Sequence, residues 1–153
     1  MKYDDASWHY GGDFPNDLPD AAGATHTGMF VAWALLAGLA GKIHINDFPE
    51  FLEKLRSHTI TPAGFFLEAC DGKFTDEDLN DEGNAFTQVY FDLERSSYLA
   101  DYNRTLAKGL PSLYHVRDTW DNFEKLRPIL ETRFKNWQKK KSSWFRRLTS
   151  RSS

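Results

Sequence analysis

The first fifteen residues concentrate side chains that could do chemistry. They include three carboxylates, one histidine and four aromatic rings, without the spacing of a helix or a strand. Neighbouring carboxylates raise one another's pKa and histidine titrates near neutrality, so such a group can supply a general acid or base. One interpretation of this pattern is a small hydrolase or lyase site, completed by a histidine from the first turn of the next helix. The candidate catalytic residues are Asp4, Asp5, His9, Asp13 and His26.

The same run also fits two other roles. In a structural role, an aspartate caps the next helix, the histidines make local hydrogen bonds, and the rings hold the chain end in place. In a binding role, the rings anchor a protein partner and the carboxylates contact it. The candidate partner-binding residues are Asp4, Asp5, Trp8, Tyr10, Asp13 and Phe14. The residue types alone leave the three roles open.

The sequence predicts neither a metal site nor a cofactor site. The five histidines form no i, i+4 pair and Cys70 stands alone, whereas zinc ligands usually recur at fixed spacings. An acidic run at residues 76–80 matches the first ligands of an EF-hand. However, Asp81 replaces the required glycine and Thr87 replaces the final glutamate. We interpret this run as a solvated helix start.

A helix expected at residues 25–40 must position the opening run, because it follows directly. Its apolar side chains point in all directions, so other elements must surround it. The apolar stretch from Met29 to Ala40 has twelve residues, whereas a membrane-spanning helix needs about 20. The sequence therefore predicts a buried core helix.

Further helices are expected around this one. Proline or capping signals predict helices beginning at Pro49 and after Thr61, a long helix from about residue 75 to 108, and a last helix from residue 118 that Pro128 kinks or restarts. Strand signals are weak and confined to residues 42–45 and 113–116. The predicted fold is mainly α, with about five helices packed around the buried central helix (residues 25–40) and an ordered N-terminal loop layer.

Charge separates the chain into two parts. Residues 1–138 carry 13 Lys and Arg against 22 Asp and Glu, a net charge of −9, whereas residues 139–153 carry six basic residues and no acidic one. We predict a single globular helical domain at 1–138 and a disordered basic tail at 139–153. The acidic domain favours a basic partner and disfavours specific nucleic-acid binding. The tail, with Trp144 and Phe145, suits weak contact with an anionic membrane surface.

Composition sets the broad class. A chain of 153 residues that is 41% hydrophobic and 15% aromatic can bury a substantial core as one domain. The single cysteine fits a reducing compartment. The acidic first residues lack the apolar run of a signal peptide. We therefore expect a soluble, cytoplasmic protein.

Three segments carry a family resemblance. They are KYDDASWHYGGDFP at residues 2–15, AGATHTGMF at 22–30 and DGKFTDE at 71–77. With them, residues 2 to about 138 resemble a family of small bacterial proteins of unassigned function, which are similar in size and context to immunity proteins of bacterial toxins. The resemblance implies a binding protein that neutralises a basic, nuclease-like toxin by covering its active site. It carries over no catalytic residue.

Overall fold

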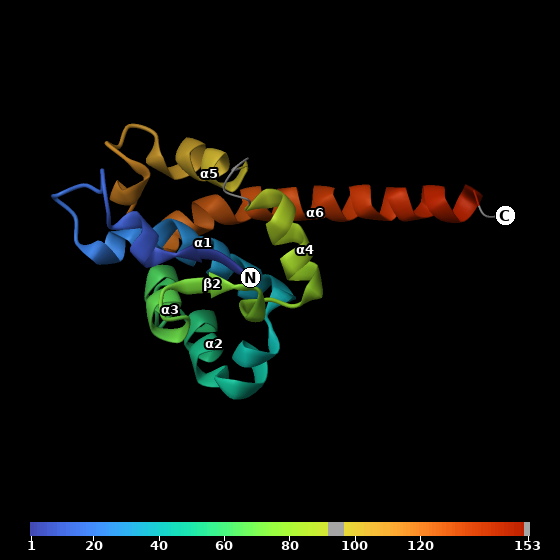
Figure 1. Cartoon of the computed structure of the whole chain (residues 1–153), viewed down its shortest axis with the longest axis horizontal. Coiled ribbons are helices and arrows are strands. Elements are labelled where there is room, and N and C mark those ends of the chain that lie inside the picture. Colours follow the sequence, from blue (N-terminus) through green and yellow to red (C-terminus); the bar gives the residue numbers. More distant parts are fainter. Residues whose placement is uncertain (92–96, 152–153) are drawn as a thin grey trace.

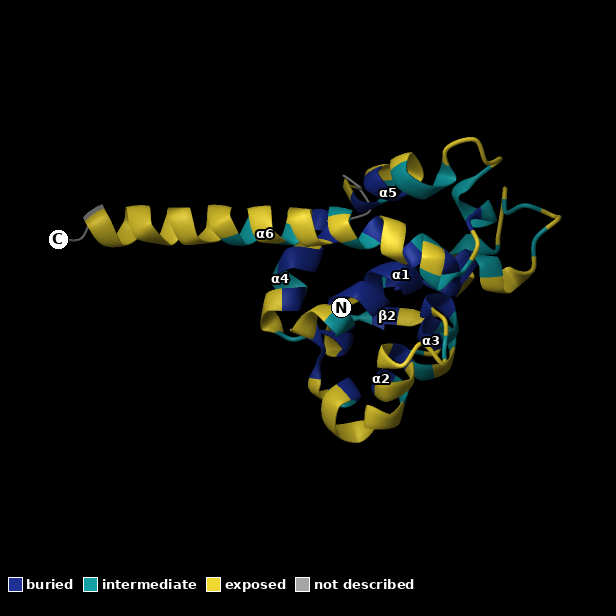
Figure 2. Ribbon diagram, turned by 180° about the vertical axis from the view of Figure 1, so that it is seen from behind, coloured by how far each residue is buried: buried dark blue, intermediate teal, exposed yellow. Residues whose placement is uncertain are grey.

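The computed structural model describes residues 1–91 and 97–151, and helix α1 (Thr25–Ala34) forms its centre. All ten residues of α1 are buried, as Figure 2 shows. The segment continues as a π-helical turn, η3 (Leu35–Leu39), in which Gly38 has a φ of +86° that glycine adopts without strain. The prediction of a buried central helix in a mainly α fold is confirmed.

The other helices surround α1 (Figure 1). Helices α2 (Pro49–Arg56) and α3 (Pro62–Ala69) lie on one side, and α4 (Asp81–Tyr90), α5 (Ser97–Tyr102) and α6 (Trp120–Arg151) enclose the rest. Two side-chain caps predicted from the sequence, at Thr61 and Thr75, are present, whereas α1 and α2 begin without a side-chain cap. Thr61 Oγ1 accepts a hydrogen bond from the Gly64 N–H at 3.1 Å, and Thr75 and Asp78 form a capping box.

By length and composition alone, the stretch Asp20–Leu39 would also qualify as a membrane-spanning helix. However, 78% of its most apolar part is buried inside the protein. This burial is the behaviour of a core helix and is consistent with a soluble protein.

The strands lie elsewhere than predicted. Strand β1 (Lys2–Asp5) pairs antiparallel with β2 (Lys73–Thr75), and Asp4 lies opposite Phe74. The two expected strands are wrong, because residues 43–47 and 113–115 form short helical turns, η4 and η7. Pairing between residues about seventy positions apart depends on the tertiary fold, and neither four-residue β1 nor three-residue β2 carries a strong local signal.

The expected long helix at residues 75–108 is also wrong. Part of it lies outside the described residues, and the rest forms η5 (Asp76–Asp78), α4, α5 and a further turn. Rings of Phe91 and Tyr98 both pack on Phe30, with centroids 4.9 and 5.1 Å away, and lie 5.3 Å from each other. In a straight helix, seven residues would separate them by about 10 Å. The two rings therefore do not occupy positions of one straight helix.

Helix α6 runs unbroken through Pro128 and through the basic segment to Arg151. The helix does not restart at Pro128 as predicted, and residues 139–151 are helical, whereas a disordered tail was predicted at residues 139–153. Pro128 is exposed, while Leu126 and Leu130 on either side of it are fully buried, so packing holds the helix across the missing N–H. Residues 139–150 are all exposed, and this part of α6 projects from the body (Figure 2). It lacks Gly and Pro and is rich in Lys and Arg, which favour helix.

Asp101 joins α5 to α6. Its buried carboxylate accepts hydrogen bonds from Arg133 Nε and Nη2 at 2.9 and 3.0 Å and from the Tyr90 hydroxyl at 2.6 Å, and pairs with Arg104. Burial alone would raise the pKa of Asp101, but the hydrogen bonds from Arg133 and Tyr90 outweigh burial and lower it. The carboxylate therefore stays ionised and attaches α6 at Arg133 to α5.

Close packing of α1 on α3 gives a testable prediction. A Cβ added at Gly28 would lie 2.8 Å from Ala63 Cα and 2.9 Å from the Pro62 carbonyl oxygen, both backbone atoms of α3. We expect Gly28→Ala to lower the free energy of unfolding by about 1–3 kcal/mol, since the helices must separate. Urea denaturation measures this. Gly11→Ala is the control, because nothing lies within 4 Å of a Cβ there; an equal loss in both variants would contradict the packing.

Candidate functional site

Asp5 serves the local structure of the opening run. Its side chain accepts hydrogen bonds from the Ser7 N–H at 3.0 Å, the Ser7 hydroxyl at 2.7 Å and Lys2 Nζ at 2.8 Å. These contacts cap the short helix η1 (Ala6–His9). Hydrogen bonds from Lys2 and Ser7 lower the pKa of Asp5 to about 2. Asp5 is thus a structural cap rather than a free acid or base.

Asp4 and His9 form the centre of the site. Asp4 is buried on β1, and both of its oxygens lie 3.0 Å from His9 Nε2. The hydroxyl of Thr27, on α1, donates a further hydrogen bond to Asp4. Burial alone would raise the pKa of Asp4, but hydrogen bonds from His9 and Thr27 lower it. The other ring nitrogen of His9, Nδ1, lies 2.9 Å from the Tyr114 hydroxyl.

His26 lies directly beneath this pair, in the first turn of α1. Its ring meets the His9 ring edge-on at 4.5 Å, and its Nε2 lies 3.8 Å from Asp4 Oδ2. Burial, with a smaller contribution from His9, lowers the pKa of His26 to about 4, so its ring is neutral at pH 7. Its Nδ1 is buried and has no hydrogen-bond partner within the described residues.

The structure separates Asp13 from the other candidate residues. Asp13 is exposed in the loop after Gly11 and Gly12, outside the Asp4 hydrogen bonds. Among the candidate partner-binding residues, Asp4 and Asp5 are buried and their carboxylates are used inside the fold. Trp8 is 55% exposed, and Tyr10 and Phe14 are half-buried with their rings in edge contact at 6.0 Å.

Thr27 and Tyr114 were not identified from the sequence. Thr27 is adjacent to His26, so its proximity to the site is local, but Tyr114 lies 105 positions after His9. A second polar cluster, His44, Cys70 and Asp78, was also missed. His44 Nε2 lies 2.8 Å from Asp78 Oδ1, and the three possible ligand atoms lie within 4.8 Å of one another. Both clusters combine distant elements, which a search for local spacings does not detect.

The site holds charge but lacks an activated nucleophile among the residues described. A nucleophilic hydroxyl is activated by an adjacent free base, by a lowered pKa or by a metal ion. Burial, and then the charge of Asp4, raise the pKa of Tyr114, and the Ser7 hydroxyl is bound to Asp5. The arrangement of Asp4, His9 and His26 is suited to hold a proton or a cation.

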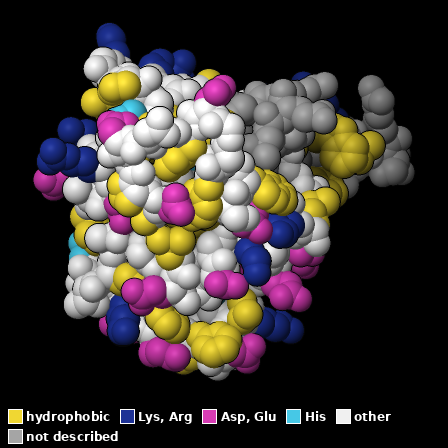
Figure 3. All heavy atoms as spheres, turned by 60° about the vertical axis from the view of Figure 1, so that its left-hand side comes forward, with side chains coloured by type: hydrophobic (Ala, Val, Ile, Leu, Met, Phe, Trp, Pro, Cys, Tyr) yellow, Lys and Arg dark blue, Asp and Glu magenta, His cyan; other side chains and the backbone are white. Residues whose placement is uncertain are grey.

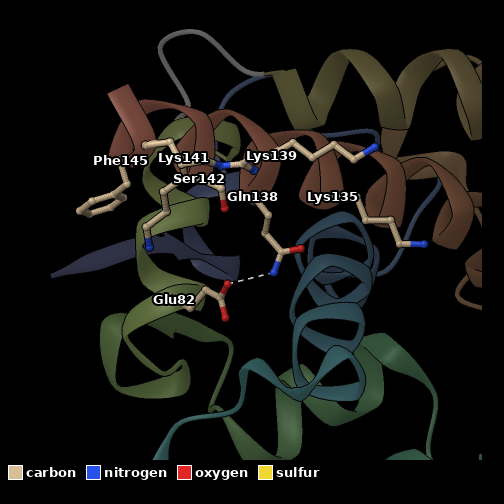
Figure 4. A pocket seen from close by; sticks show the side chains of 8 residues that line it. Glu82, Lys135, Gln138, Lys139, Lys141, Ser142 and Phe145 are labelled. Atoms are coloured by element: carbon tan, nitrogen blue, oxygen red, sulfur yellow. Dashed lines mark hydrogen bonds between the residues drawn. The ribbon is translucent and has the colours of Figure 1, made fainter. Parts of the chain in front are cut away.

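Surface grooves also lie outside this site. One of about 750 Å³ lies where α6 passes the start of α4, and Gln138 Nε2 donates to Glu82 Oε1 across it at 3.0 Å (Figure 4). Its lining includes four basic residues, all on α6, and one acidic residue. Another, about 680 Å³, is acidic, with Asp47, Glu77 and Asp81 against Lys42.

The hydrogen bond from Thr27 to Asp4 gives the second prediction. Thr27→Val preserves shape but leaves the buried Asp4 carboxylate with one donor fewer. We expect a loss of about 1–3 kcal/mol in the free energy of unfolding at pH 7. Thermal and urea unfolding measure it, with the exposed Thr59→Val as control, for which a change within about 0.5 kcal/mol is expected. If Thr27→Val were as stable as Thr59→Val, the hydrogen bond from Thr27 to Asp4 would not contribute to holding the N-terminal segment in place.

Comparison with known proteins places this geometry in a family. No curated protein and no solved structure matches the chain significantly. A family model described as "Domain of unknown function (DUF7832)" matches residues 2–116. This match spans both polar clusters and ends before α6, whereas the resemblance was expected to extend to about residue 138. Because the match covers well over half of the sequence, the chain belongs to the DUF7832 family.

Proposed function

We propose that this protein is a binding protein for a basic protein partner, and that it acts in the cytoplasm as a bacterial immunity protein that neutralises a toxin by occluding it. The observation that carries the proposal is the acidic groove beside η4. Three carboxylates line it against one lysine. Such a concentration of one charge attracts the opposite charge and speeds association.

The groove also offers apolar contact area. Ile45 lines it and is 53% exposed, and the neighbouring Phe48 is 46% exposed. Interfaces combine apolar anchors with a polar rim. In Figure 3, carboxylates and hydrophobic side chains lie interspersed over one face of the body. With the net charge of −9 on residues 1–138, these features suit a cationic polypeptide. Two of the candidate partner-binding residues, Trp8 and Asp13, are also exposed.

The alternative, a small hydrolase or lyase, has less support. It would rest on the chain of contacts from Asp4 through His9 to Tyr114. Both ring nitrogens of His9 are already engaged, and Tyr114 has a raised pKa, opposite to the activation that nucleophilic catalysis needs.

Neutralising the groove tests the binding proposal. We expect the triple variant Asp47→Asn, Glu77→Gln, Asp81→Asn to associate with the copurified partner about tenfold more slowly at low salt. The partner is isolated on tagged wild-type protein from the native host, and rates are measured on an optical biosensor.

The matched control removes the same charge from α6, with Asp121→Asn, Glu124→Gln and Glu131→Gln, and should bind at nearly the wild-type rate. Equal losses in the two variants would argue against the groove. A wild-type protein that elutes alone and protects against no neighbouring toxin would contradict the immunity role.

A second binding role is suggested by the projecting end of α6. Trp144 and Leu148 stand four residues apart on one helix face, 59% and 45% exposed, and Phe145 beside them is 52% exposed. Basic side chains surround them. A helix end that combines exposed aromatic and apolar side chains with cations can contact an anionic membrane surface.

Vesicle binding checks this role. Wild-type protein should bind vesicles of phosphatidylserine and phosphatidylcholine in cosedimentation, and Trp144→Ser with Leu148→Ser should weaken this binding. Vesicles of phosphatidylcholine alone serve as the control for charge. Equal binding of wild type and variant to the anionic vesicles would exclude a role for this helix end.

A further inference from the structure

We propose that Asp4, His9 and His26 form a binding site for a divalent transition-metal ion, with zinc as the ion that they fit best. Two histidines and one carboxylate are a ligand set that such ions accept. The inference does not depend on the proposed partner-binding function, because the acidic groove shares no residue with this cluster.

The spacing of the ligand atoms fits an ion between them. His9 Nε2 lies 3.0 Å from each Asp4 oxygen, His26 Nε2 lies 3.8 Å from Asp4 Oδ2, and the three ligand atoms lie within 4.8 Å of one another. Around a tetrahedral zinc ion with bonds of about 2.0–2.1 Å, neighbouring ligand atoms are about 3.3 Å apart. The observed distances lie on either side of that value, so an ion needs only small side-chain movements to bind.

Outer contacts hold these ligands in place. The Tyr114 hydroxyl lies 2.9 Å from His9 Nδ1 and leaves Nε2 directed at Asp4. Thr27 donates to Asp4, and the His26 backbone carbonyl accepts a hydrogen bond from the buried Tyr98 hydroxyl. Metal sites use such second contacts to fix the orientation and the basicity of their ligands.

Protonation and access also agree with an ion at this place. A metal ligand must be a neutral imidazole or an ionised carboxylate. The lowered pKa values of His26 and Asp4 provide those forms at pH 7. Asp4 and His26 are buried, whereas the His9 side chain is 17% exposed, so an ion can enter from the His9 side. Three protein ligands leave a fourth position for water or for a group of a partner.

The second cluster, His44, Cys70 and Asp78, is a weaker candidate. Asp78 Oδ2 accepts the Thr75 N–H at 2.8 Å in the capping box, and Oδ1 lies 2.8 Å from His44 Nε2. Burial raises the pKa of the Cys70 thiol far above its usual value, whereas a metal needs the thiolate. This cluster therefore provides the internal control.

Calorimetric titration of Zn²⁺ into chelator-treated full-length protein tests the site. We expect wild type to bind one ion, His9→Gln to lose binding, and Tyr114→Phe to bind about 10–100-fold more weakly, because its ring remains but its hydroxyl is lost. Cys70→Ser should bind as wild type does. Substitution with Co²⁺ should give visible absorption in the wild type that His9→Gln lacks.

Circular dichroism establishes that each variant is folded before the titration. Failure of wild type to take up Zn²⁺, or full binding by folded His9→Gln, overturns the proposal. The groove variants that test partner binding should take up Zn²⁺ normally, so the two proposals can fail separately.

Discussion

The rest of the fold depends on a helix that has no face toward solvent. Because all ten residues of α1 are buried, other elements must pack against every side of the helix. In a chain of 153 residues, most of the remaining helices are needed for this packing. Helix α3 approaches so closely that Gly28 is required, and α4, α5 and α6 supply rings to the remaining sides. The first turn of α1 adds a difficulty, since Thr25, His26 and Thr27 are polar and buried. Buried polar groups need partners, and the opening run supplies one to Thr27 through the Asp4 carboxylate.

This requirement explains the composition of the first fifteen residues. Asp4 accepts from Thr27 and lies against His9, which in turn meets Tyr114. Asp5 turns the chain so that η1 can close over the helix. The run therefore combines carboxylates with rings because it covers a polar helix end set in an aromatic core. The cation site inferred at the same place uses the same side chains, and an ion there would join β1, η1 and α1.

Sequence reasoning predicted what local forces decide. The all-round apolar pattern of α1, the Thr61 cap and the Thr75 capping box depend on residues within a few positions of one another, and all three were predicted. The prediction of one long helix at residues 75–108 was wrong, because Phe91 and Tyr98 both pack on the Phe30 ring. Tyr114 could not be identified as a partner of His9, since only the tertiary fold brings them together. Of the five candidate catalytic residues, Asp4, His9 and His26 lie together, Asp5 serves as a cap, and Asp13 lies apart.

The distribution of charge separates the surfaces available for function. The body carries an acidic groove next to exposed apolar residues, and the projecting end of α6 carries cations and rings. The cluster of Asp4, His9 and His26 lies largely beneath the surface, and its contacts hold the N-terminal segment against α1. Binding of a basic partner, contact with a membrane and uptake of a metal ion would therefore involve different residues. Each can be altered without touching the others.

The most direct test of the central claim is the protonation of His26, followed by NMR of its imidazole nitrogens in metal-free protein. If the opening run seals the end of α1, His26 stays neutral in the folded state until the pH approaches about 4. In the unfolded chain it takes up its proton near pH 6.5. The folded pKa is therefore depressed, and this group's contribution to stability is complete above about pH 6.5 and is lost as the pH falls toward 4. Titration of folded His26 near pH 6.5, with no loss of stability over that range, would show that the helix end is open to water and would contradict the fold's central constraint.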